Sequence, residues 1–282
     1  MRLASYNFRG RPSFGAVVGD GIIDLRTRLG RFATLLDVFR AQALGQAKAA
    51  AQGARPELRL GEVELLPPLL APEKILCIGI NYADRTKDYD MAEKPKYPSM
   101  FYRAPNSLVG HGQHLIRPKV SEQLDYEGEI AMVIGRQCKH VPKEGALAVI
   151  AGLTLCNEGT IRDWIRHGKF NVTQGKNFDS SGSIGPWIAT DVDLAKPLHL
   201  TVRKNGEVTQ DDTTTNLIFS FPELISYITT FMTLKPGDIV STGTPVKKES
   251  NAAEPLWLKP GDTIEIECPD VGVLRNSVVD EA

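Results

Sequence analysis

The stretch LDYEGEIAMVI, residues 124–134, decides how the rest of this sequence is interpreted. Its apolar second half predicts a strand over Glu127–Ile134 that runs into a hydrophobic core. Side chains alternate between the faces of a strand, so Glu127 and Glu129 project from one face, with Gly128 between them on the other. Neighbouring carboxylates repel, and one of their pKa values rises unless a cation lies between them. A hard divalent ion with oxygen ligands removes that repulsion.

A third carboxylate, Glu158, stands at the end of another apolar stretch. Ile150–Cys156 predicts a second strand, and Gly159 directly after Glu158 allows close approach of the backbone. Three carboxylates, completed by waters or substrate oxygens, suit octahedral Mg²⁺. No histidine lies close by in sequence to indicate zinc. The competing interpretation is a solvent-facing acidic strand edge, which the apolar run after Glu129 disfavours.

Composition narrows the class of protein. The chain has 282 residues, 42% of them hydrophobic, and 33 basic residues balance 34 acidic ones without a basic stripe. We therefore expect no nucleic-acid partner. The four cysteines form no CxxC pair, which argues against a zinc ribbon or a disulfide framework. The N-terminus lacks the apolar core of a signal peptide, and no stretch approaches the roughly 20 apolar residues that cross a bilayer. These features predict no membrane association and a cytoplasmic location.

Composition also changes along the chain. Short strands are expected at the start, over Arg2–Phe8, Gly15–Val18 and Gly21–Asp24. A helix is predicted over Phe32–Ala51, where apolar residues share one stripe. Residues 52–74 are rich in proline, glycine and charge and read as a connector. We therefore predict a small N-terminal domain over residues 1–70 and a larger domain over residues 71–282.

The larger domain has mainly strand signals. Ile75–Ile78 is a short apolar strand, and Phe221–Met232 has the apolar spacing of a helix. The sequence LKPGD occurs at residues 234–238 and again at 258–262, each time before an apolar strand. Pro-Gly favours a tight turn, and two such turns feeding neighbouring strands indicate a β-rich domain. No regular alternation of strand and helix is evident, so a doubly wound sheet is disfavoured.

Nucleotide and nucleophile signatures are incomplete. Gly110-His111-Gly112 begins like a dinucleotide fingerprint, but Leu115 stands where its third glycine belongs. Gly175-Lys176 lacks the earlier glycine of a P-loop, because Phe170 occupies that position. There is no GxSxG motif. Covalent and nucleotide-dependent chemistry are therefore unsupported.

The ordered motifs of this chain resemble those of the fumarylacetoacetate hydrolase superfamily. They extend over about residues 75–246 and follow the order found in the family. They are Gly79-Ile80-Asn81-Tyr82, Pro105-Asn106-Ser107-Leu108-Val109-Gly110, Asp125-Tyr126-Glu127-Gly128-Glu129, Arg162-Asp163, Gly175-Lys176-Asn177-Phe178-Asp179, and Gly237-Asp238 with Thr242-Gly243-Thr244-Pro245.

The resemblance implies an α+β, β-rich fold: a mixed β-sandwich roll after a small N-terminal α/β domain, usually in a homodimer. It also implies a Mg²⁺ or Mn²⁺ site on Glu127, Glu129 and the acidic residue before the Arg-Asp pair. That third ligand is usually aspartate in the family, and here it is Glu158. Glutamate reaches one methylene further than aspartate, so the position of the metal or the denticity of this carboxylate is expected to differ.

Further site residues follow from the same motifs. The family lysine matches Lys176, which is expected near the 2-oxo oxygen of the substrate as a charge stabiliser or proton donor. The family turn that holds a substrate carboxylate matches Thr242–Pro245 and points to Gly243 and Thr244. Tyr82 and Asp179 are the remaining expected substrate contacts within motifs. Candidates to pair with a distal carboxylate, because arginine favours bidentate contacts, are Arg103, Arg85 and Lys94.

Two departures from the family pattern concern the reaction. Family members that hydrolyse C–C bonds carry a histidine and a glutamate, three residues apart, on a mobile lid. Those positions are Arg85 and Asp88 here, and arginine cannot act as a general base. Asp88 can still take a proton. Ile165 stands where many members have a glutamine that binds substrate.

The expected substrate is a small 2-oxo acid, processed through a metal-stabilised enolate. Family frequencies favour C–C bond hydrolysis of an acylpyruvate-type compound in aromatic catabolism, and we place this reaction narrowly first. The missing lid histidine instead favours isomerisation, tautomerisation or decarboxylation of a 2-hydroxydienoate or an oxaloacetate-like acid, which need no activated water. A non-catalytic protein that binds a metal and an oxo acid is the third alternative.

Overall fold

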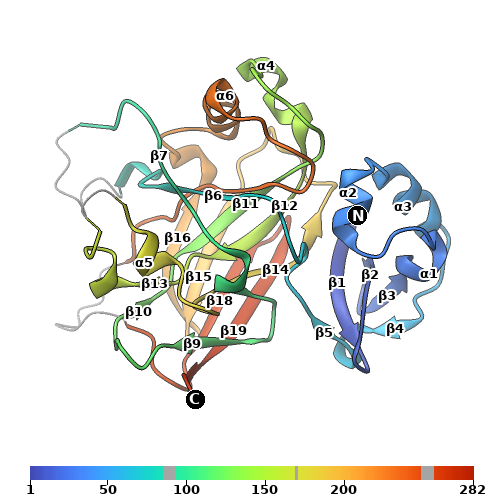
Figure 1. The fold of residues 1–282 in the computed structure, drawn as a ribbon, viewed down its shortest axis with the longest axis horizontal. Helices are drawn as coiled ribbons and strands as arrows, with labels where there is room; N and C mark the ends of the chain where they lie inside the picture. The colour runs from blue at the N-terminus through green and yellow to red at the C-terminus, as the bar shows by residue number, and fades with distance from the viewer. Residues whose placement is uncertain (85–92, 169–170, 249–256) are drawn as a thin grey trace.

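The structure is a computed structural model that describes residues 1–84, 93–168, 171–248 and 257–282 (Figure 1). Its strands are β1 (Arg2–Phe8), β2 (Arg11–Val18), β3 (Gly21–Asp24), β4 (Leu58–Arg59), β5 (Glu64–Leu65), β6 (Ile75–Gly79), β7 (Ser99–Tyr102), β8 (Leu108–Val109), β9 (His114–Arg117), β10 (Leu124–Asp125), β11 (Gly128–Ile134), β12 (Ile150–Asn157), β13 (Thr160–Ile161), β14 (Gly182–Ala189), β15 (His199–Lys204), β16 (Glu207–Thr213), β17 (Ile239–Ser241), β18 (Thr263–Cys268) and β19 (Gly272–Asp280). Its helices are α1 (Leu25–Leu29), α2 (Leu35–Arg40), α3 (Leu44–Ala51), α4 (Lys143–Ala146), α5 (Thr173–Lys176) and α6 (Phe221–Phe231), with short 3₁₀ turns at Leu60–Glu62, Pro105–Ser107, Leu147–Val149, Arg162–Trp164 and Thr214–Asn216. Among the described residues, no helix combines the length and the apolar character needed to cross a bilayer.

A mixed sheet of 12 strands runs through most of the described chain. Its main path is β4-β3-β2-β1-β14-β12-β11-β17-β6-β7, with β5 paired to β1 and β8 paired to β14. Most neighbours are antiparallel, whereas β17 with β6 and β14 with β8 are parallel. β11 and β12, beside whose ends the predicted acidic residues lie, are at the centre of this sheet. The predicted α+β, β-rich class is confirmed.

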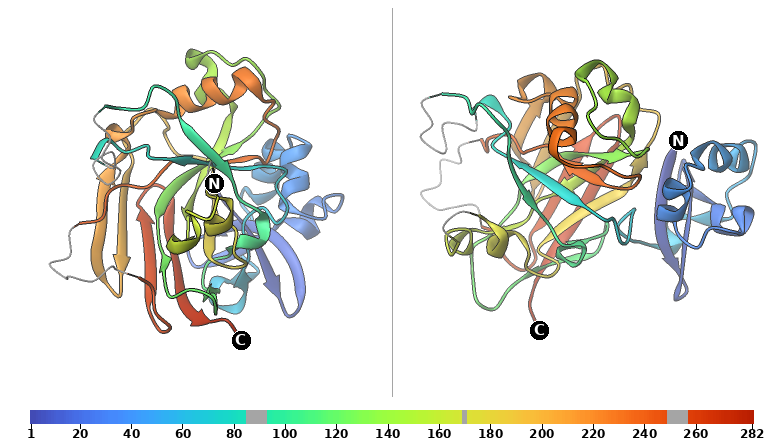
Figure 2. Two further views of the ribbon diagram at one scale, coloured as in Figure 1. Left: turned by 60° about the vertical axis from the view of Figure 1, so that its left-hand side comes forward. Right: turned by 45° about the horizontal axis from the view of Figure 1, so that its top comes forward.

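A second sheet, in the order β16-β15-β18-β19-β9, packs against the centre of the large one. The core between them includes Ile130 on β11, Val202 on β15 and Ile266 on β18, all fully buried. A side-chain carbon at Gly128 would overlap the Val202 Cγ2 methyl, so only glycine fits there. This face of β11 is therefore the interior of the sandwich, and the acidic side chains lie on the other face. Helix α6, beside α4, also packs into this core (Figure 2).

The N-terminal strands continue the large sheet. β1 pairs antiparallel with β14, with Leu3 opposite Ile188, while α1–α3 lie beside β1–β3 (Figures 1 and 2). Leu3 and Phe39 belong to a buried cluster that also includes Val133 and Ile188 from the larger body. Residues before and after position 70 thus share both a sheet and a core. The domain boundary near residue 70 stays a prediction.

The single helix predicted over Phe32–Ala51 is wrong. The structure has α2 and α3 there, separated by a break at which Gln42 adopts a φ of 53°. Thr34 begins α2 by accepting a hydrogen bond from Asp37 N at 3.2 Å, and Asp37 Oδ2 accepts one from Thr34 N at 2.9 Å. The apolar stripe predicted the buried side, but it contains no signal for the left-handed residue that divides the segment.

The two LKPGD sequences form similar turns but feed different sheets. Gly237 and Gly261 have φ values of 88° and 90°, as the predicted turns require. The first turn leads into β17 of the large sheet and the second into β18 of the small sheet. The expectation that they feed neighbouring strands is therefore wrong, because turn chemistry is local and does not select the partner of the following strand.

Candidate metal centre

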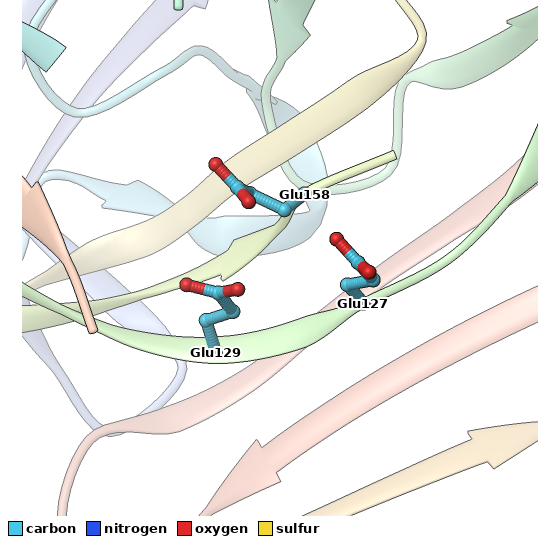
Figure 3. Close-up of side chains that lie close together, drawn as sticks. All are labelled: Glu127, Glu129 and Glu158. Atoms are coloured by element: carbon cyan, nitrogen blue, oxygen red, sulfur yellow. The ribbon is translucent and has the colours of Figure 1, made fainter. Parts of the chain in front are cut away.

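Three predicted carboxylates meet beside the ends of β11 and β12 (Figure 3). Glu127 precedes β11, Glu129 is its second residue, and Glu158 directly follows β12. The strands pair with Gly128 opposite Asn157. Glu158 N donates to the Glu127 carbonyl at 2.8 Å, and Glu127 N donates to Asn157 Oδ1 at 3.0 Å. The sheet itself thus holds residues some 30 positions apart as neighbours.

The cluster is buried and crowded with negative charge. Glu127, Glu129 and Glu158 are 5%, 1% and 1% exposed, and one oxygen from each lies within 4.8 Å of the others. Burial and the adjacent Glu158 and Glu127 carboxylates raise the pKa of Glu129 well above its usual range. Within the described ranges, Glu158 Oε1 is buried without a hydrogen-bond partner. All-oxygen ligands and a buried orphan carboxylate oxygen fit a hard divalent cation.

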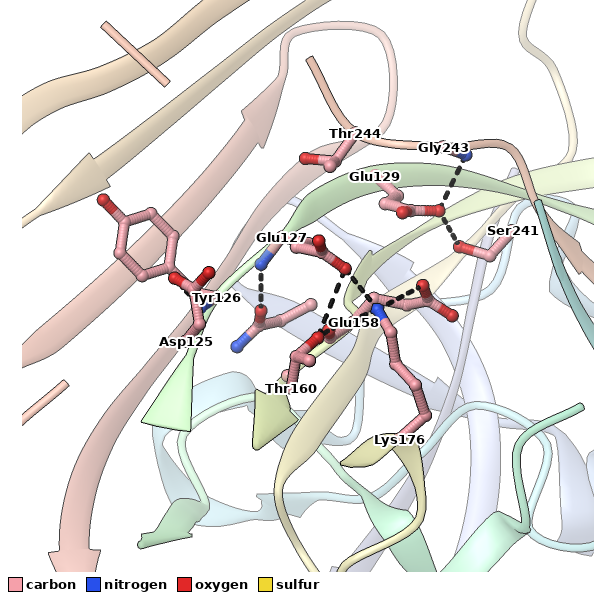
Figure 4. A network of polar contacts seen from close by, with 12 residues as sticks. Asp125, Tyr126, Glu127, Glu129, Glu158, Thr160, Lys176, Ser241, Gly243 and Thr244 are labelled. Carbon is pink, nitrogen blue, oxygen red and sulfur yellow. Dashed lines mark hydrogen bonds and ion pairs between the residues drawn. The ribbon is translucent and has the colours of Figure 1, made fainter. Parts of the chain in front are cut away.

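Two protein cations, Lys176 (Figure 4) and Arg162, partly balance these carboxylates. Lys176 Nζ contacts Glu127 Oε2 closely and lies 3.1 Å from Glu158 Oε2, while Arg162 Nη2 lies 2.5 Å from Glu127 Oε1. Burial lowers the pKa of Lys176, but the Glu127 and Glu158 carboxylates outweigh it and raise that pKa overall. With all three carboxylates ionised, the two cations leave a net charge of one negative unit, which attracts a further cation.

Lys176 reaches the cluster because α5 packs very close to the segment after β13. A side-chain carbon at Gly175 would overlap the Ile165 Cγ2 methyl and lie 2.7 Å from the Ile161 carbonyl oxygen. Glycine at position 175 therefore allows nearly backbone-to-backbone contact. This contact directs the next side chain, Lys176, inward, where its ammonium lies 5.1 Å from the centre of the Phe101 ring.

Glu129 is anchored from β17 and the residues that follow it. Ser241 Oγ donates to Glu129 Oε2 at 2.7 Å, and Gly243 N donates to the same oxygen at 2.8 Å (Figure 4). Gly243 has a φ of 98°, and a side-chain carbon there would lie 2.7 Å from Asn81 Cβ. Asn81 Nδ2 in turn donates to the Thr242 carbonyl at 2.8 Å. Gly243 thus contacts one of the clustered carboxylates, and its predicted role next to substrate stays a prediction.

The three glutamates open into a cavity of about 130 Å³. Thr244, predicted to bind substrate, lines it, and its hydroxyl oxygen accepts a hydrogen bond from Gln210 Nε2 at 2.8 Å. The remaining lining residues are Ile78, Gly79, Ile80, Ser99, Phe101, Arg162, Ile165, Val172 and Lys176. The walls are therefore mainly apolar and the polar groups gather at the carboxylates. A larger groove of about 1100 Å³, near Arg2 and Trp187, includes none of the three glutamates.

Three residues predicted to bind substrate lie away from this cavity. Arg103 is 3% exposed, and its guanidinium donates to the Gly159 carbonyl at 2.8 Å and to Ser181 Oγ at 3.1 Å. Tyr82 is fully buried in the core. Asp179 accepts a hydrogen bond from Asn106 Nδ2 at 2.5 Å outside the cavity lining. The roles of these three residues in substrate binding stay predictions, and Arg103 holds the backbone next to Glu158.

Two of the predicted catalytic residues belong to the expected lid. Arg85 and Asp88 lie outside the described residues, so their catalytic roles stay predictions. Lys94 is described and exposed. Sequence reasoning missed Ser241 as a contact of Glu129. The Arg-Asp motif at residues 162–163 is the sequence signal for the position of Arg162 beside Glu127.

Most of the chain matches one family model. Residues 74–279 match the model described as fumarylacetoacetate (FAA) hydrolase C-terminal, a span that includes all three glutamates.

Individual proteins are similar to this chain in sequence or in structure. The oxaloacetate tautomerase Fahd2a, mitochondrial, of Rattus norvegicus is 35% identical over 272 residues, covering 93% of this chain and 85% of that protein. A 2-hydroxyhepta-2,4-diene-1,7-dioate isomerase structure from Mycobacterium marinum is 29% identical, with a TM-score of 0.75 over 100% of this chain and 99% of that one. Maleylpyruvate hydrolase from Sphingobium sp. SYK-6, solved with manganese(II) and pyruvate, is 25% identical, with a TM-score of 0.82 over 100% of both chains. These likenesses confirm the expected family fold.

Proposed function

Because this chain belongs to the fumarylacetoacetate hydrolase family, we propose that it is an enzyme that interconverts the keto and enol forms of a small 2-oxo acid. In this proposal Glu127, Glu129 and Glu158 hold Mg²⁺ or Mn²⁺. The observation that carries it is the meeting of these three buried carboxylates, beside the ammonium of Lys176, at one small cavity.

The bound cation would supply a Lewis acid that polarises the 2-oxo group. The ammonium of Lys176, which lies 3.1 Å from Glu158 Oε2 and lines the cavity, would donate a hydrogen bond to the substrate oxygen. Gln210 donates to the Thr244 oxygen, which leaves the Thr244 hydroxyl proton for an acceptor in the cavity, such as a substrate carboxylate. The apolar walls near Phe101 and Ile165 would limit the access of water.

Keto–enol conversion moves one proton from carbon 3 of the acid to its 2-oxo oxygen, without breaking a C–C bond. The named activity of the rat relative, which aligns with 93% of this chain, supports this reaction over the hydrolysis that the sequence placed narrowly first. Arg85 in place of a lid histidine favours it as well. Hydrolysis of an acylpyruvate-type acid is the second candidate, supported by the likeness to maleylpyruvate hydrolase.

The test is a panel of oxaloacetate, acylpyruvates and a 2-hydroxymuconate-type diene acid, assayed with Mn²⁺ or Mg²⁺ and again with a chelator. We expect chelator-sensitive loss of the enol absorbance of oxaloacetate, abolished by Glu129→Gln. Glu122→Gln, which changes an exposed carboxylate close in sequence, is the matched control and should retain activity. Cleavage of the acylpyruvates would establish a hydrolase. Metal binding without turnover on the whole panel would favour a non-catalytic binding protein.

The homodimer and the cytoplasmic location expected from the sequence stay predictions. Light scattering of the purified protein tests the homodimer, because a molar mass near 30.9 kDa would indicate a monomer.

A further inference from the structure

A second group of buried charges lies directly behind Glu127. Asp125, the last residue of β10, is 4% exposed and does not line the cavity. Its Oδ1 atom contacts Lys247 Nζ and accepts a hydrogen bond from Tyr126 N at 2.8 Å, while Arg162 Nε donates to its Oδ2 atom at 2.7 Å. Both oxygens of this carboxylate are therefore engaged within the protein.

Arg162 connects this group to the candidate metal centre. Its Nε atom is fixed on Asp125, and its Nη2 atom lies 2.5 Å from Glu127 Oε1. The guanidinium is planar and rigid, so anchoring one edge on Asp125 fixes where the other edge meets Glu127. The second Glu127 oxygen, Oε2, contacts Lys176 and accepts a hydrogen bond from Thr160 Oγ1 at 3.3 Å. The two oxygens of Glu127 thus have separate partners, which sets the plane of the carboxylate.

Lys247 completes the charge balance of this group. Its side chain is 19% exposed, and Nζ lies 3.9 Å from the centre of the Tyr126 ring. Among the described residues, Arg162 and Lys247 are the cations in contact with Asp125, whereas Arg162 and Lys176 contact Glu127. Without Lys247, Asp125 would depend on Arg162 alone for charge compensation and would draw it away from Glu127.

We propose that Asp125 and Lys247 are positioning residues, which hold Arg162 against Glu127 so that this carboxylate is oriented for a divalent cation. The inference rests on the cation site of the proposed function. It adds Lys247, from the segment after the Thr-Gly-Thr-Pro turn, as a residue that acts on that site without touching it.

The test measures Mn²⁺ affinity by calorimetry for Lys247→Met, Asp125→Asn and the double variant. We expect each single change to weaken binding about 10- to 100-fold, as disruption of groups that orient a ligand does. Losing both charges together leaves no uncompensated charge at position 125 to draw Arg162 away from Glu127. The double variant should therefore bind Mn²⁺ at least about fivefold more tightly than the two single effects multiplied together would give. The matched controls are Lys248→Met and Asp211→Asn, from an exposed neighbouring ion pair at 3.2 Å, and should leave the affinity unchanged.

The direction of the Lys247→Met effect separates positioning from simple electrostatics. Removal of a nearby positive charge, without any reorientation, would tighten binding of a cation. Tighter or unchanged binding of Mn²⁺ by Lys247→Met therefore overturns the inference. A double variant whose loss of affinity equals the two single losses multiplied together overturns it as well. Lys247 is partly exposed, so this comparison decides the question even if Asp125→Asn does not fold. If the wild-type protein does not bind Mn²⁺, the proposed function is overturned together with the inference. If the wild type binds Mn²⁺ and all variants bind it equally well, only the inference is overturned.

Discussion

At the scale of single residues, Glu129 lies in an environment that disfavours its ionised form. Its Oε2 atom accepts hydrogen bonds from Ser241 Oγ and Gly243 N, both uncharged donors. Burial and the two adjacent carboxylates raise its pKa well above the usual range. A charged partner at this position would therefore stabilise the ionised form of Glu129 more than the existing neutral hydrogen bonds do.

Glu129→Gln should separate metal binding from folding. Glutamine can accept the same two hydrogen bonds and adds no repulsion, so we expect the variant to be at least as stable as the wild type in the presence of a chelator. Its Mn²⁺ affinity should fall by at least about tenfold. Calorimetric titration and thermal unfolding with and without Mn²⁺ measure both effects. A variant that binds Mn²⁺ like the wild type would remove Glu129 from the ligand set.

The sequence predicts the acidic cluster at this scale, but not its partners. Alternation along one strand brings Glu127 and Glu129 together, and the family motif adds Glu158. The contacts of Ser241 and Lys247 join positions more than 100 residues apart, and no local pattern encodes them. For the same reason the sequence does not predict that Arg103 donates a hydrogen bond to the Gly159 carbonyl.

At the scale of elements, helix α5 is positioned by a single glycine. Gly175→Ala would place a carbon against Ile165 and the Ile161 carbonyl, so α5 must shift and take Lys176 with it. We expect a loss of about 1–3 kcal/mol in the free energy of unfolding and a fall of about 10- to 100-fold in kcat/KM. Gly45→Ala in α3, where a side-chain carbon meets nothing within 4 Å, is the control and should leave activity unchanged. Equal activity of the two variants would refute this role of Gly175.

Helix α6 carries a cap whose strength depends on pH. Ser220 N and Oγ both donate to Glu223 Oε2 at 2.9 Å, and Lys143 Nζ lies 2.9 Å from Oε1. The hydrogen bonds from Lys143 and the Ser220 backbone lower the pKa of Glu223 from 4.5 to about 2. Because the folded pKa lies below the unfolded one, this stabilisation is complete above about pH 4.5 and is lost as the pH falls toward 2.

Glu223→Gln keeps the shape of the cap and removes its charge. We expect the variant to be about 0.5–1 kcal/mol less stable at pH 7, a small value because the side chain is partly exposed. The difference should shrink below about pH 4.5. Urea unfolding of both proteins at pH 7 and at lower pH measures it, with Glu144→Gln on the neighbouring α4 as the control. A difference that stays constant with pH would mean that charge plays no part.

Elements with a strong local pattern are predictable from this sequence, and breaks within them are not. β1 and β3 have the predicted bounds, and α6 ends one residue earlier than expected. The segment over Phe32–Ala51 has a continuous apolar stripe, yet tertiary packing divides it at Gln42. Local patterns do not predict the strand order either, because β17 pairs with β11 and β6, which lie far from it in the sequence.

At the scale of the whole molecule, the pairing of β1 with β14 ties the N-terminal strands to the larger body. Leu3 is fully buried at this junction and shares a core with Ile188. The three tryptophans, Trp164, Trp187 and Trp257, all lie after residue 70. Trp187 packs against the buried cluster of Ala4 and Tyr6, so its fluorescence reports on this junction as well as on the larger body.

Leu3→Ala should therefore change a signal that arises far from position 3 in sequence. We expect a loss of about 2–5 kcal/mol in the free energy of unfolding and an earlier tryptophan transition that coincides with the loss of far-UV circular dichroism. An unshifted tryptophan transition would instead mean that residues 1–70 unfold independently of the larger body, as a separate domain would.

The alternation along β11 has a consequence for how the sheet is assembled. Glu127 and Glu129 face one side, whereas Gly128 faces Val202 and Ile266 in the interior of the sandwich. A slip of one residue against β12 would turn both carboxylates into that interior. Burying an unpaired ion there costs several kcal/mol or more. The acidic pair therefore helps to select the register of β11 against β12, because a pairing shifted by one residue would bury both carboxylates in the sandwich.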